Sequence, residues 1–270
     1  MTIFEALILG IIQGATEFLP ISSSGHLVIL PILFKMPPAD LTLVGVLHLG
    51  SLIAVLLYFR RDLGGIITAV ISGLQQRDPL GTTNARLGWL IVVGTIPAII
   101  PGALLKKPLE ALFTSPQGAA FFLLVTAALL IIGERILSGD KAPADMVWKD
   151  AIIIGLFQAF ALLPGISRSG STIVGGLQRG LDRPAAARFS FLLGVPVILA
   201  AGLLSLGDAF SAEATFSPAV YIAGFLSAAI TGYLCIYFLL RWVRNHTLYI
   251  FAAYCALMGV GYLLYSLIGP

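Results

Sequence analysis

Six stretches of this chain are apolar, nearly free of charged residues, and about as long as a bilayer-crossing helix. They cover residues 41–59, 87–105, 118–133, 189–207, 219–240 and 247–268. A helix needs roughly 20 apolar residues to cross the hydrocarbon core. Only 11% of the residues are charged, against about 25% in soluble domains, which leaves too little polar surface to dissolve the chain. The sequence therefore predicts an all-α integral membrane protein, with residues 1–270 forming a single membrane domain.

Two further apolar stretches, residues 3–34 and 151–180, are each interrupted near the middle by a cluster of Pro, Ser and Gly. The clusters are residues 19–25 (LPISSSG) and 164–170 (PGISRSG). Proline lacks the amide hydrogen and clashes with the preceding turn, so a helix breaks there. Irregular backbone at membrane depth is tolerated only where protein or a water-filled cavity covers it. We therefore expect two re-entrant helical hairpins.

The two interrupted stretches also resemble each other. Aligned without gaps, residues 10–26 and 155–171 share six identities, which are Gly10/Gly155, Gln13/Gln158, Ile21/Ile166, Ser22/Ser167, Ser24/Ser169 and Gly25/Gly170. Each hairpin is followed by three predicted spans. Because three is an odd number, the second copy would be inverted relative to the first. The sequence predicts two inverted repeats, about 1–135 and about 150–270.

The placement of positive charge predicts the orientation of the spans. If the spans alternate, most Lys and Arg residues fall on one side: Arg60, Arg61, Arg77, Arg86, Arg135, Lys141, Lys149, Arg179, Arg183, Arg188, Arg241 and Arg244. Lys35, Lys106 and Lys107 fall on the other side. Excess positive charge marks the cytoplasmic side. Both termini and the mouth of the first hairpin would then face outward, and the second hairpin would enter from the cytoplasm.

Ionisable groups inside a membrane are candidate functional residues because burying them is unfavourable. Glu17, His26 and Arg168 lie at the two interruptions. Gln13 and Glu17 are four residues apart and share a helix face. Glu17, His26 and Arg168 each have a structural alternative. The Glu17 carboxylate could be capped by the serine turn, the His26 imidazole could bond to backbone, and the Arg168 guanidinium could pair with Glu17. We expect His48, mid-span and without an acidic neighbour in its segment, to be packed and hydrogen-bonded.

Half-helices beginning near Gly25 and Gly170 would point their amino ends at the bilayer midplane. Helix amino ends carry unpaired N–H groups and partial positive charge, and they bind anions. Arg168 adds a planar cationic fork suited to phosphate oxygens. Two such ends facing each other would suit a diphosphate, with both glycines at the substrate-binding turns.

The interruptions carry a family resemblance. Residues 13–20 (QGATEFLP) and 22–26 (SSSGH) resemble the first signature of the bacterial undecaprenyl-diphosphate phosphatases of the bacitracin-resistance type. Residues 164–172 (PGISRSGST) resemble their second signature. The similarity extends over essentially the whole chain. It implies hydrolysis of undecaprenyl diphosphate in the bacterial plasma membrane, which recycles the lipid carrier of peptidoglycan synthesis.

The resemblance also implies roles for individual residues. The catalytic residues would be Glu17, Ser23, His26 and Arg168, and the substrate would be bound by Ser167, Ser169 and Thr172. A divalent cation, Mg²⁺ or Ca²⁺, would be held by Glu17 and Gln13. The family often has Glu at the position of Gln13, so this ligand set is weaker than usual. Ser23, His26 and a water molecule all stay open as the nucleophile.

Two other classes of function compete with the phosphatase. Inverted repeats with broken helices also characterise secondary transporters, so a transporter or lipid flippase with an anion site at the midplane is the main alternative. A non-catalytic lipid-binding scaffold is the other. The expected partners are a polyprenyl diphosphate lipid and the membrane, with no nucleic acid, and a homodimer stays open. The site would open to the extracytoplasmic side.

Overall fold

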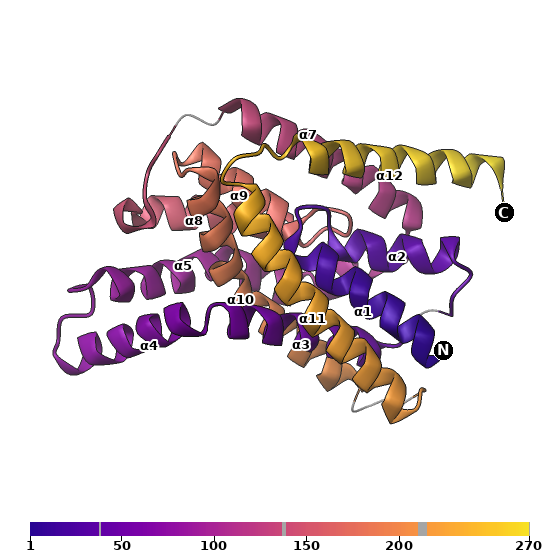
Figure 1. The fold of residues 1–270 in the computed structure, drawn as a ribbon, viewed down its shortest axis with the longest axis horizontal. Helices are drawn as coiled ribbons and strands as arrows, with labels where there is room; N and C mark the ends of the chain where they lie inside the picture. Colours follow the sequence, from indigo (N-terminus) through magenta and orange to yellow (C-terminus); the bar gives the residue numbers. More distant parts are fainter. Residues whose placement is uncertain (38, 137–138, 210–214, 270) are drawn as a thin grey trace.

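The computed structural model describes residues 1–37, 39–136, 139–209 and 215–269, and these residues fold into α-helices with one short 3-10 turn (Figure 1). The first half holds α1 (Ile3–Phe18), α2 (Ser23–Leu33), α3 (Leu41–Tyr58), α4 (Arg60–Gln75), α5 (Thr83–Leu104), α6 (Lys106–Leu112) and α7 (Pro116–Ile136). The second half holds the turn η1 (Pro143–Asp145), α8 (Trp148–Phe160), α9 (Arg168–Gln178), α10 (Arg183–Ala209), α11 (Pro218–Trp242) and α12 (Tyr249–Ile268).

Six of the described helices have the length and hydropathy needed to cross a bilayer. These are α3, α5, α7, α10, α11 and α12, with mean hydropathies between 1.7 and 2.1. Their outer surfaces remain apolar where no other helix covers them, as at Ile230 (62% exposed) and Leu257 (75% exposed). A surface of this kind suits lipid chains rather than water. The prediction of an all-helical chain with six candidate membrane spans is confirmed.

The two Pro/Ser/Gly clusters break the chain into short helix pairs, as predicted. The first break separates α1 from α2 and the second separates α8 from α9. In each, a serine caps the second helix: Ser22 Oγ accepts from the Gly25 amide at 3.2 Å, and Ser167 Oγ accepts from the Gly170 amide at 3.1 Å. Such caps satisfy amide groups that have no partner within the helix. The second helices begin at Ser23 and Arg168, close to the predicted Gly25 and Gly170.

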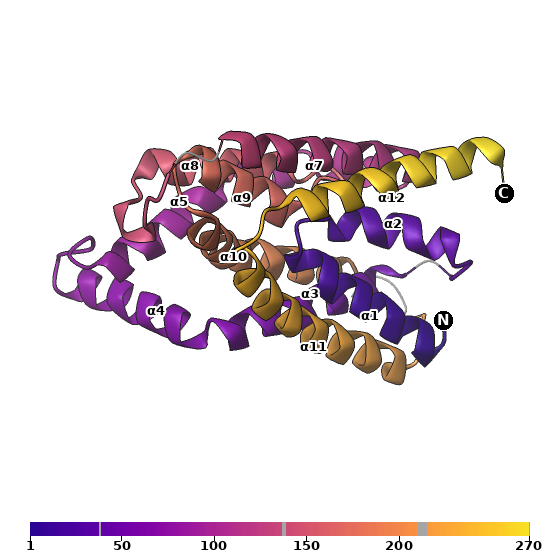
Figure 2. The ribbon, with the colours of Figure 1, turned by 45° about the horizontal axis from the view of Figure 1, so that its top comes forward.

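The helices of the two halves pack on one another in matching pairs. Helix α1 packs against α11 and α8 packs against α5, while α3 packs on α10 and α7 on α12. The α7–α12 and α1–α11 pairs lie side by side in both views (Figures 1 and 2). A β-carbon on Gly14 would lie 2.4 Å from the carbonyl oxygen of Ala228, and one on Gly155 would lie 2.4 Å from that of Gly94. Glycine therefore permits the close approach at both α1–α11 and α8–α5.

Helices α4 and α6 were not anticipated from the sequence. Helix α4 packs against α5, and in both views it projects with the start of α5 away from the other helices. It is too polar to resemble a span, since it opens with Arg60, Arg61 and Asp62. Its apolar residues Ile67 and Ile71 are at least half exposed. The stretch after α3 is thus helical up to Gln75.

Several ion pairs, from largely buried to exposed, gather at one end of the bundle. Arg188 of α10 donates to Asp62 of α4 at 2.5 Å, and Arg183 pairs with Glu134 of α7. Asp150 at the start of α8 accepts from Lys141 and, at 2.8 Å, from Arg179. These contacts join residues that the charge pattern assigned to a single side of the membrane. The assignment of that side to the cytoplasm stays a prediction.

We expect Gly14→Ala to destabilise the protein by about 1–3 kcal/mol, because the added methyl group overlaps the α11 backbone. Thermal unfolding of the detergent-solubilised protein measures the effect. Gly261→Ala is the matched control, since a β-carbon there meets nothing within 4 Å and should change stability by less than about 1 kcal/mol. Equal unfolding temperatures for the two variants would contradict the close packing of α1 on α11.

Candidate functional site

The two interrupted turns contact each other in the interior of the protein. The Gly165 amide donates to Ser24 Oγ at 3.3 Å, and Ser169 Oγ donates to the carbonyl oxygen of Leu19 at 3.1 Å. A β-carbon on Gly25 would lie 3.1 Å from the α-carbon of Gly165. The predicted site residues of both halves are therefore brought together from positions about 145 residues apart in the sequence.

The central contact between the turns is an ion pair between Glu17 and Arg168. The guanidinium nitrogen Nη2 donates to Glu17 Oε1 at 2.8 Å, and Nη1 donates to the carbonyl oxygen of Ser190 at 3.1 Å. The Arg168 side chain is 12% exposed and that of Glu17 is 7% exposed. Two charges removed from water are tolerated when paired and hydrogen-bonded. The structure thus contains the Glu17–Arg168 pair, while a structural and a catalytic role for the two residues both stay open.

The second oxygen of the Glu17 carboxylate faces the serine turn of its own hairpin. Ser23 Oγ donates to Glu17 Oε2 at 2.7 Å, and the Gln13 amide nitrogen donates to the same oxygen at 3.2 Å. Ser23 is half-buried and Gln13 is fully buried. A nucleophilic hydroxyl is typically hydrogen-bonded to a general base, and a third group orients that base. Ser23, Glu17 and Gln13 have this arrangement.

The hydroxyl groups of Ser167, Ser169 and Thr172 in the second hairpin are buried and bonded to other protein groups. Thr172 Oγ1 lies 2.6 Å from Ser190 Oγ and donates to the carbonyl oxygen of Arg168 at 2.8 Å. Ser167 Oγ lies 3.2 Å from Ser169 Oγ. Ser167, Ser169 and Thr172 are each 1% exposed. These residues order the turn around Arg168, and their direct contact with a substrate stays a prediction.

The amino ends of α2 and α9 both lie at the contact between the turns. The first N–H groups of a helix have no intrahelical acceptor, which applies to Ser23 and Ser24 in α2 and to Arg168 and Ser169 in α9. Helix amino ends also carry partial positive charge. Together with the guanidinium of Arg168, they make this region chemically suited to a phosphate group.

His26 belongs to the first turn, but its side chain points to another helix. Its Nδ1 lies 2.7 Å from the carbonyl oxygen of Ser22, and its Nε2 lies 2.8 Å from the hydroxyl of Tyr254 on α12. A carbonyl oxygen only accepts, so Nδ1 carries the hydrogen and Nε2 accepts from Tyr254. The two rings are stacked, with centroids 5.5 Å apart and planes 8° apart. The described contacts do not join His26 to Glu17 or Arg168.

Three residues that touch the site were missed in the sequence: Thr126, Ser190 and Tyr254. The Ser167 amide donates to Thr126 Oγ1 at 3.0 Å, and that hydroxyl donates to the carbonyl oxygen of Gly165 at 2.9 Å. Thr126 and Tyr254 are single polar side chains within apolar spans and carry no local signal, and Ser190 lies in a stretch that shares the family resemblance but was given no role. His48, in contrast, behaves as expected: its Nδ1 donates to the carbonyl oxygen of Val44 at 2.8 Å.

The donor set at Gln13 and Glu17 does not fit a metal ion held by the protein alone. Both Glu17 oxygens already accept hydrogen bonds, one of them from a cation. Gln13 Oε1 is buried and has no hydrogen-bond partner in the described structure, so one carbonyl ligand is available. Mg²⁺ requires six oxygen ligands and Ca²⁺ six to eight. The described residues contain no cluster of three or more His, Cys, Asp and Glu residues able to hold a metal.

Comparison with known proteins points to one family. Residues 6–261 match the model of the family described as "Bacitracin resistance protein BacA". The chain is 44% identical over 260 residues to a protein of Myxococcus xanthus named "Undecaprenyl-diphosphatase", covering 96% of this chain and 88% of that one. It is 44% identical to one of the same name from Chlorobaculum tepidum, covering 97% and 96%. A third, from Thermomicrobium roseum, is 43% identical, covering 98% of each chain.

We expect Glu17→Gln and Arg168→Gln each to destabilise the protein by about 3 kcal/mol, because each leaves a buried charge without its partner. A double-mutant cycle, measured by thermal unfolding in detergent, should show strong coupling between the two changes. The control is Asp62→Asn, because the Asp62–Arg188 pair is 35% and 50% exposed and should contribute less than about 1 kcal/mol. Additive effects at Glu17 and Arg168 would contradict the described ion pair.

Proposed function

The chain belongs to the bacitracin resistance protein BacA family, and on that premise we propose that it hydrolyses undecaprenyl diphosphate at the contact between its two turns. The products are undecaprenyl phosphate and inorganic phosphate. The relatives named for this activity align along nearly their whole length. The residues that the family resemblance assigns to the reaction meet in one place in the structure, with His26 on its border.

The observation that carries the proposal is the continuous chain of contacts from Ser23 through Glu17 to Arg168. Ser23 Oγ lies 2.7 Å from Glu17 Oε2, and Glu17 Oε1 lies 2.8 Å from Arg168 Nη2. A general base must lie within hydrogen-bond reach of the proton that it takes. Glu17 meets that condition for Ser23, while the Nε2 of His26 is bonded to Tyr254. We therefore favour Ser23 over His26 as the nucleophile.

In the first step Ser23 Oγ attacks the terminal phosphorus, and Glu17 takes the hydroxyl proton. The bond from that phosphorus to the bridging oxygen breaks, and undecaprenyl phosphate leaves with the electron pair. In the second step water attacks the phosphoserine, inorganic phosphate departs, and Ser23 recovers a proton from Glu17. Both steps concentrate negative charge on phosphate oxygens, which preorganised donors stabilise.

Arg168 supplies the principal donor for those oxygens. A guanidinium has five N–H groups, and within the described structure Arg168 uses one to bind Glu17 and one to bind Ser190. The remaining N–H groups can bind phosphate in the bidentate manner typical of arginine. The amide groups at the starts of α2 and α9 add neutral donors. Glu17 and Gln13 would hold a divalent cation together with water and the diphosphate oxygens. Such an ion would stabilise negative charge on those oxygens, and it stays a proposal.

We also propose that the fold consists of two inverted repeats, each with a re-entrant hairpin, in a bacterial plasma membrane. The exchange of partners supports this: the first hairpin packs on the second span of the other half, and the second hairpin does the same in return. The first spans of the two halves, α3 and α10, contact each other, and so do the third spans, α7 and α12. Corresponding helices contact each other in this way when they lie next to a twofold axis. The site would open to the extracytoplasmic side. One chain holds every residue of the site, so a homodimer is a separate hypothesis.

We expect Ser23→Ala and Arg168→Lys each to lower kcat by at least about 100-fold, since one loses the nucleophile and the other loses a bidentate donor. Phosphate release from undecaprenyl diphosphate by purified protein measures this. The wild-type protein, quenched during turnover with substrate labelled at the terminal phosphate, should carry the label on Ser23. Label on His26 would exclude the serine route. An unlabelled wild-type protein together with a fully active Ser23→Ala variant would also exclude it. Lipid transport without any phosphate release would favour the transporter alternative.

We expect Tyr254→Phe to lower kcat/KM about fivefold, because it removes one hydrogen bond from His26 and keeps the stacked ring. The test for a positioning role is the same change in a His26→Ala background, where Tyr254→Phe should have no further effect. Equal losses in both backgrounds would mean that Tyr254 acts only through the general packing of α12.

A further inference from the structure

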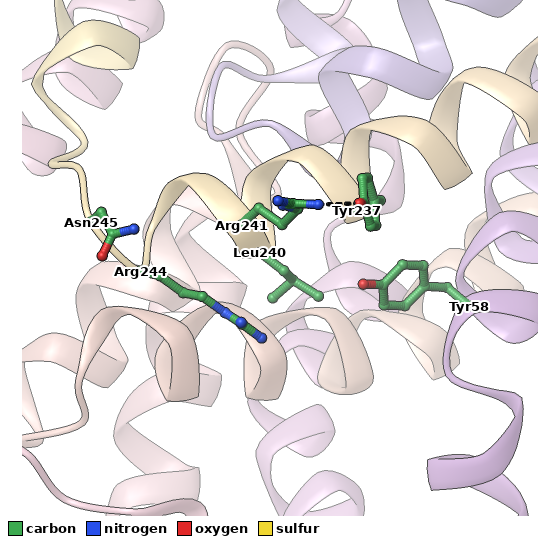
Figure 3. Close-up of a pocket in the computed structure, with 6 residues that line it drawn as sticks. All are labelled: Tyr58, Tyr237, Leu240, Arg241, Arg244 and Asn245. Atoms are coloured by element: carbon green, nitrogen blue, oxygen red, sulfur yellow. Dashed lines mark hydrogen bonds between the residues drawn. The ribbon is translucent and has the colours of Figure 1, made fainter.

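A second region with arginine side chains around a cavity lies at the arginine-rich end of the bundle, apart from the hairpin turns. A cavity of about 350 Å³ opens there beside the carboxyl end of α11. Its lining consists of Tyr58 of α3 with Tyr237, Leu240, Arg241, Arg244 and Asn245 (Figure 3). The lining contains two cations and several neutral donors, with no carboxylate among its described residues. None of these residues takes part in the proposed hydrolysis.

The two arginines of the cavity differ in how they are held. Arg241 donates to the Tyr237 hydroxyl, and its guanidinium carbon lies 5.3 Å from the centre of the same ring. Arg244 is exposed and has no hydrogen bond or ion pair within the part of the chain that the structure describes. In Figure 3 the Arg244 side chain and the Tyr58 hydroxyl extend toward the same space below Leu240. One cation is therefore fixed and the other is available to a ligand.

Carboxylates lie nearby, but they line a neighbouring cavity. That cavity, of about 410 Å³, shares Tyr58, Leu240 and Arg244 with the first and contains Asp62, Asp140 and Asp182. Asp62 is paired with Arg188, and Asp182 accepts from the Ala185 amide at 2.7 Å. Neither these two carboxylates nor Asp140 forms a described ion pair with Arg244, so the lining of the first cavity keeps two arginines and no carboxylate.

The surface beside the cavity is apolar and continues along α11. Ile230, Leu234 and Tyr237 are 62%, 59% and 47% exposed, and they lie on the helix face that leads to Arg241. Positions three and four apart fall on one face of a helix. An acyl chain against this stripe would bring a lipid head group to the two arginines. Aromatic side chains at such a boundary are typical of the membrane–water interface.

We infer that this cavity binds the phosphate group of an anionic membrane lipid, with Arg244 and Arg241 as the cationic donors and Tyr58 and Asn245 as neutral donors. The apolar stripe distinguishes the ligand from free phosphate, which would use the cavity but not the helix face. This cavity also differs in function from the hairpin turns, because there the bound phosphate is the group proposed to react.

The test is retention of phosphatidylglycerol over phosphatidylcholine by the purified full chain, measured by native mass spectrometry from mixed detergent–lipid micelles. An arginine near an anionic lipid surface contributes about 1 kcal/mol, or roughly fivefold in affinity. We expect R241A combined with R244A to lower the affinity for phosphatidylglycerol by about 25-fold. The doubly substituted Arg241→Lys, Arg244→Lys variant should keep most of it.

Arg86→Ala is the matched control, because Arg86 is an exposed arginine of the same predicted side that does not line the cavity. Its affinity should equal that of the wild-type protein. An equal loss in Arg86→Ala would attribute binding to general surface charge, and no loss in the double alanine variant would exclude the cavity; either overturns the inference. Displacement of phosphatidylglycerol by millimolar inorganic phosphate would also overturn it, in favour of a free-phosphate site. Phosphate release by each variant verifies that it is folded.

Discussion

The ion pair between Glu17 and Arg168 is the contact on which the rest of the site depends. An unpaired carboxylate or guanidinium in this environment would be strongly destabilising, so neither turn can place its charged residue inward without the other. Their union at 2.8 Å fixes the relative position of two turns that are far apart in the sequence. It also orients the carboxylate so that its free edge meets Ser23. The interaction that makes the buried charges tolerable is thus also the one that brings together the groups proposed to react.

The two helix breaks lie inside an apolar bundle, so the surrounding helices must cover the irregular backbone and supply partners for its polar groups. Each break leaves backbone amide groups that need partners, and serine caps, turn-to-turn hydrogen bonds and the Thr126 hydroxyl provide many of them. The short helices must also approach their neighbours closely to cover the exposed backbone. Glycines at the α1–α11 and α8–α5 contacts permit that approach. Donor groups left over at the helix starts are then available for an anion.

Charge is distributed unevenly between the two regions of the protein. At the turns a single guanidinium faces one carboxylate, whereas the arginine-rich end joins several cations to Asp62, Glu134 and Asp150. Those outer pairs connect α4, α7, α8 and α10, so they set how the helices of the two halves meet. Arg244 stands apart from them with its charge unneutralised by any described carboxylate. Several arginines at this end therefore join helices through ion pairs, whereas Arg241 and Arg244 are the ones proposed to bind a lipid phosphate.

The sequence by itself determined the membrane class, the six spans and the two helix breaks, because these depend on local composition and on the conformational limits of proline and glycine. It also singled out Glu17, His26 and Arg168 as candidates, since ionisable residues are conspicuous within apolar segments, whereas Ser23 became a candidate through the family resemblance. Helix α4 escaped detection because its polar and apolar residues are mixed in proportions that suit either a loop or an amphipathic helix. Among the partners of the site, Thr126 and Tyr254 carry no local signal, and Ser190 lies in a stretch that shares the family resemblance but was given no role. Only the tertiary structure decided that His26 bonds to Tyr254 while Ser23 bonds to Glu17, because the direction of each side chain is set by contacts between segments remote in the chain.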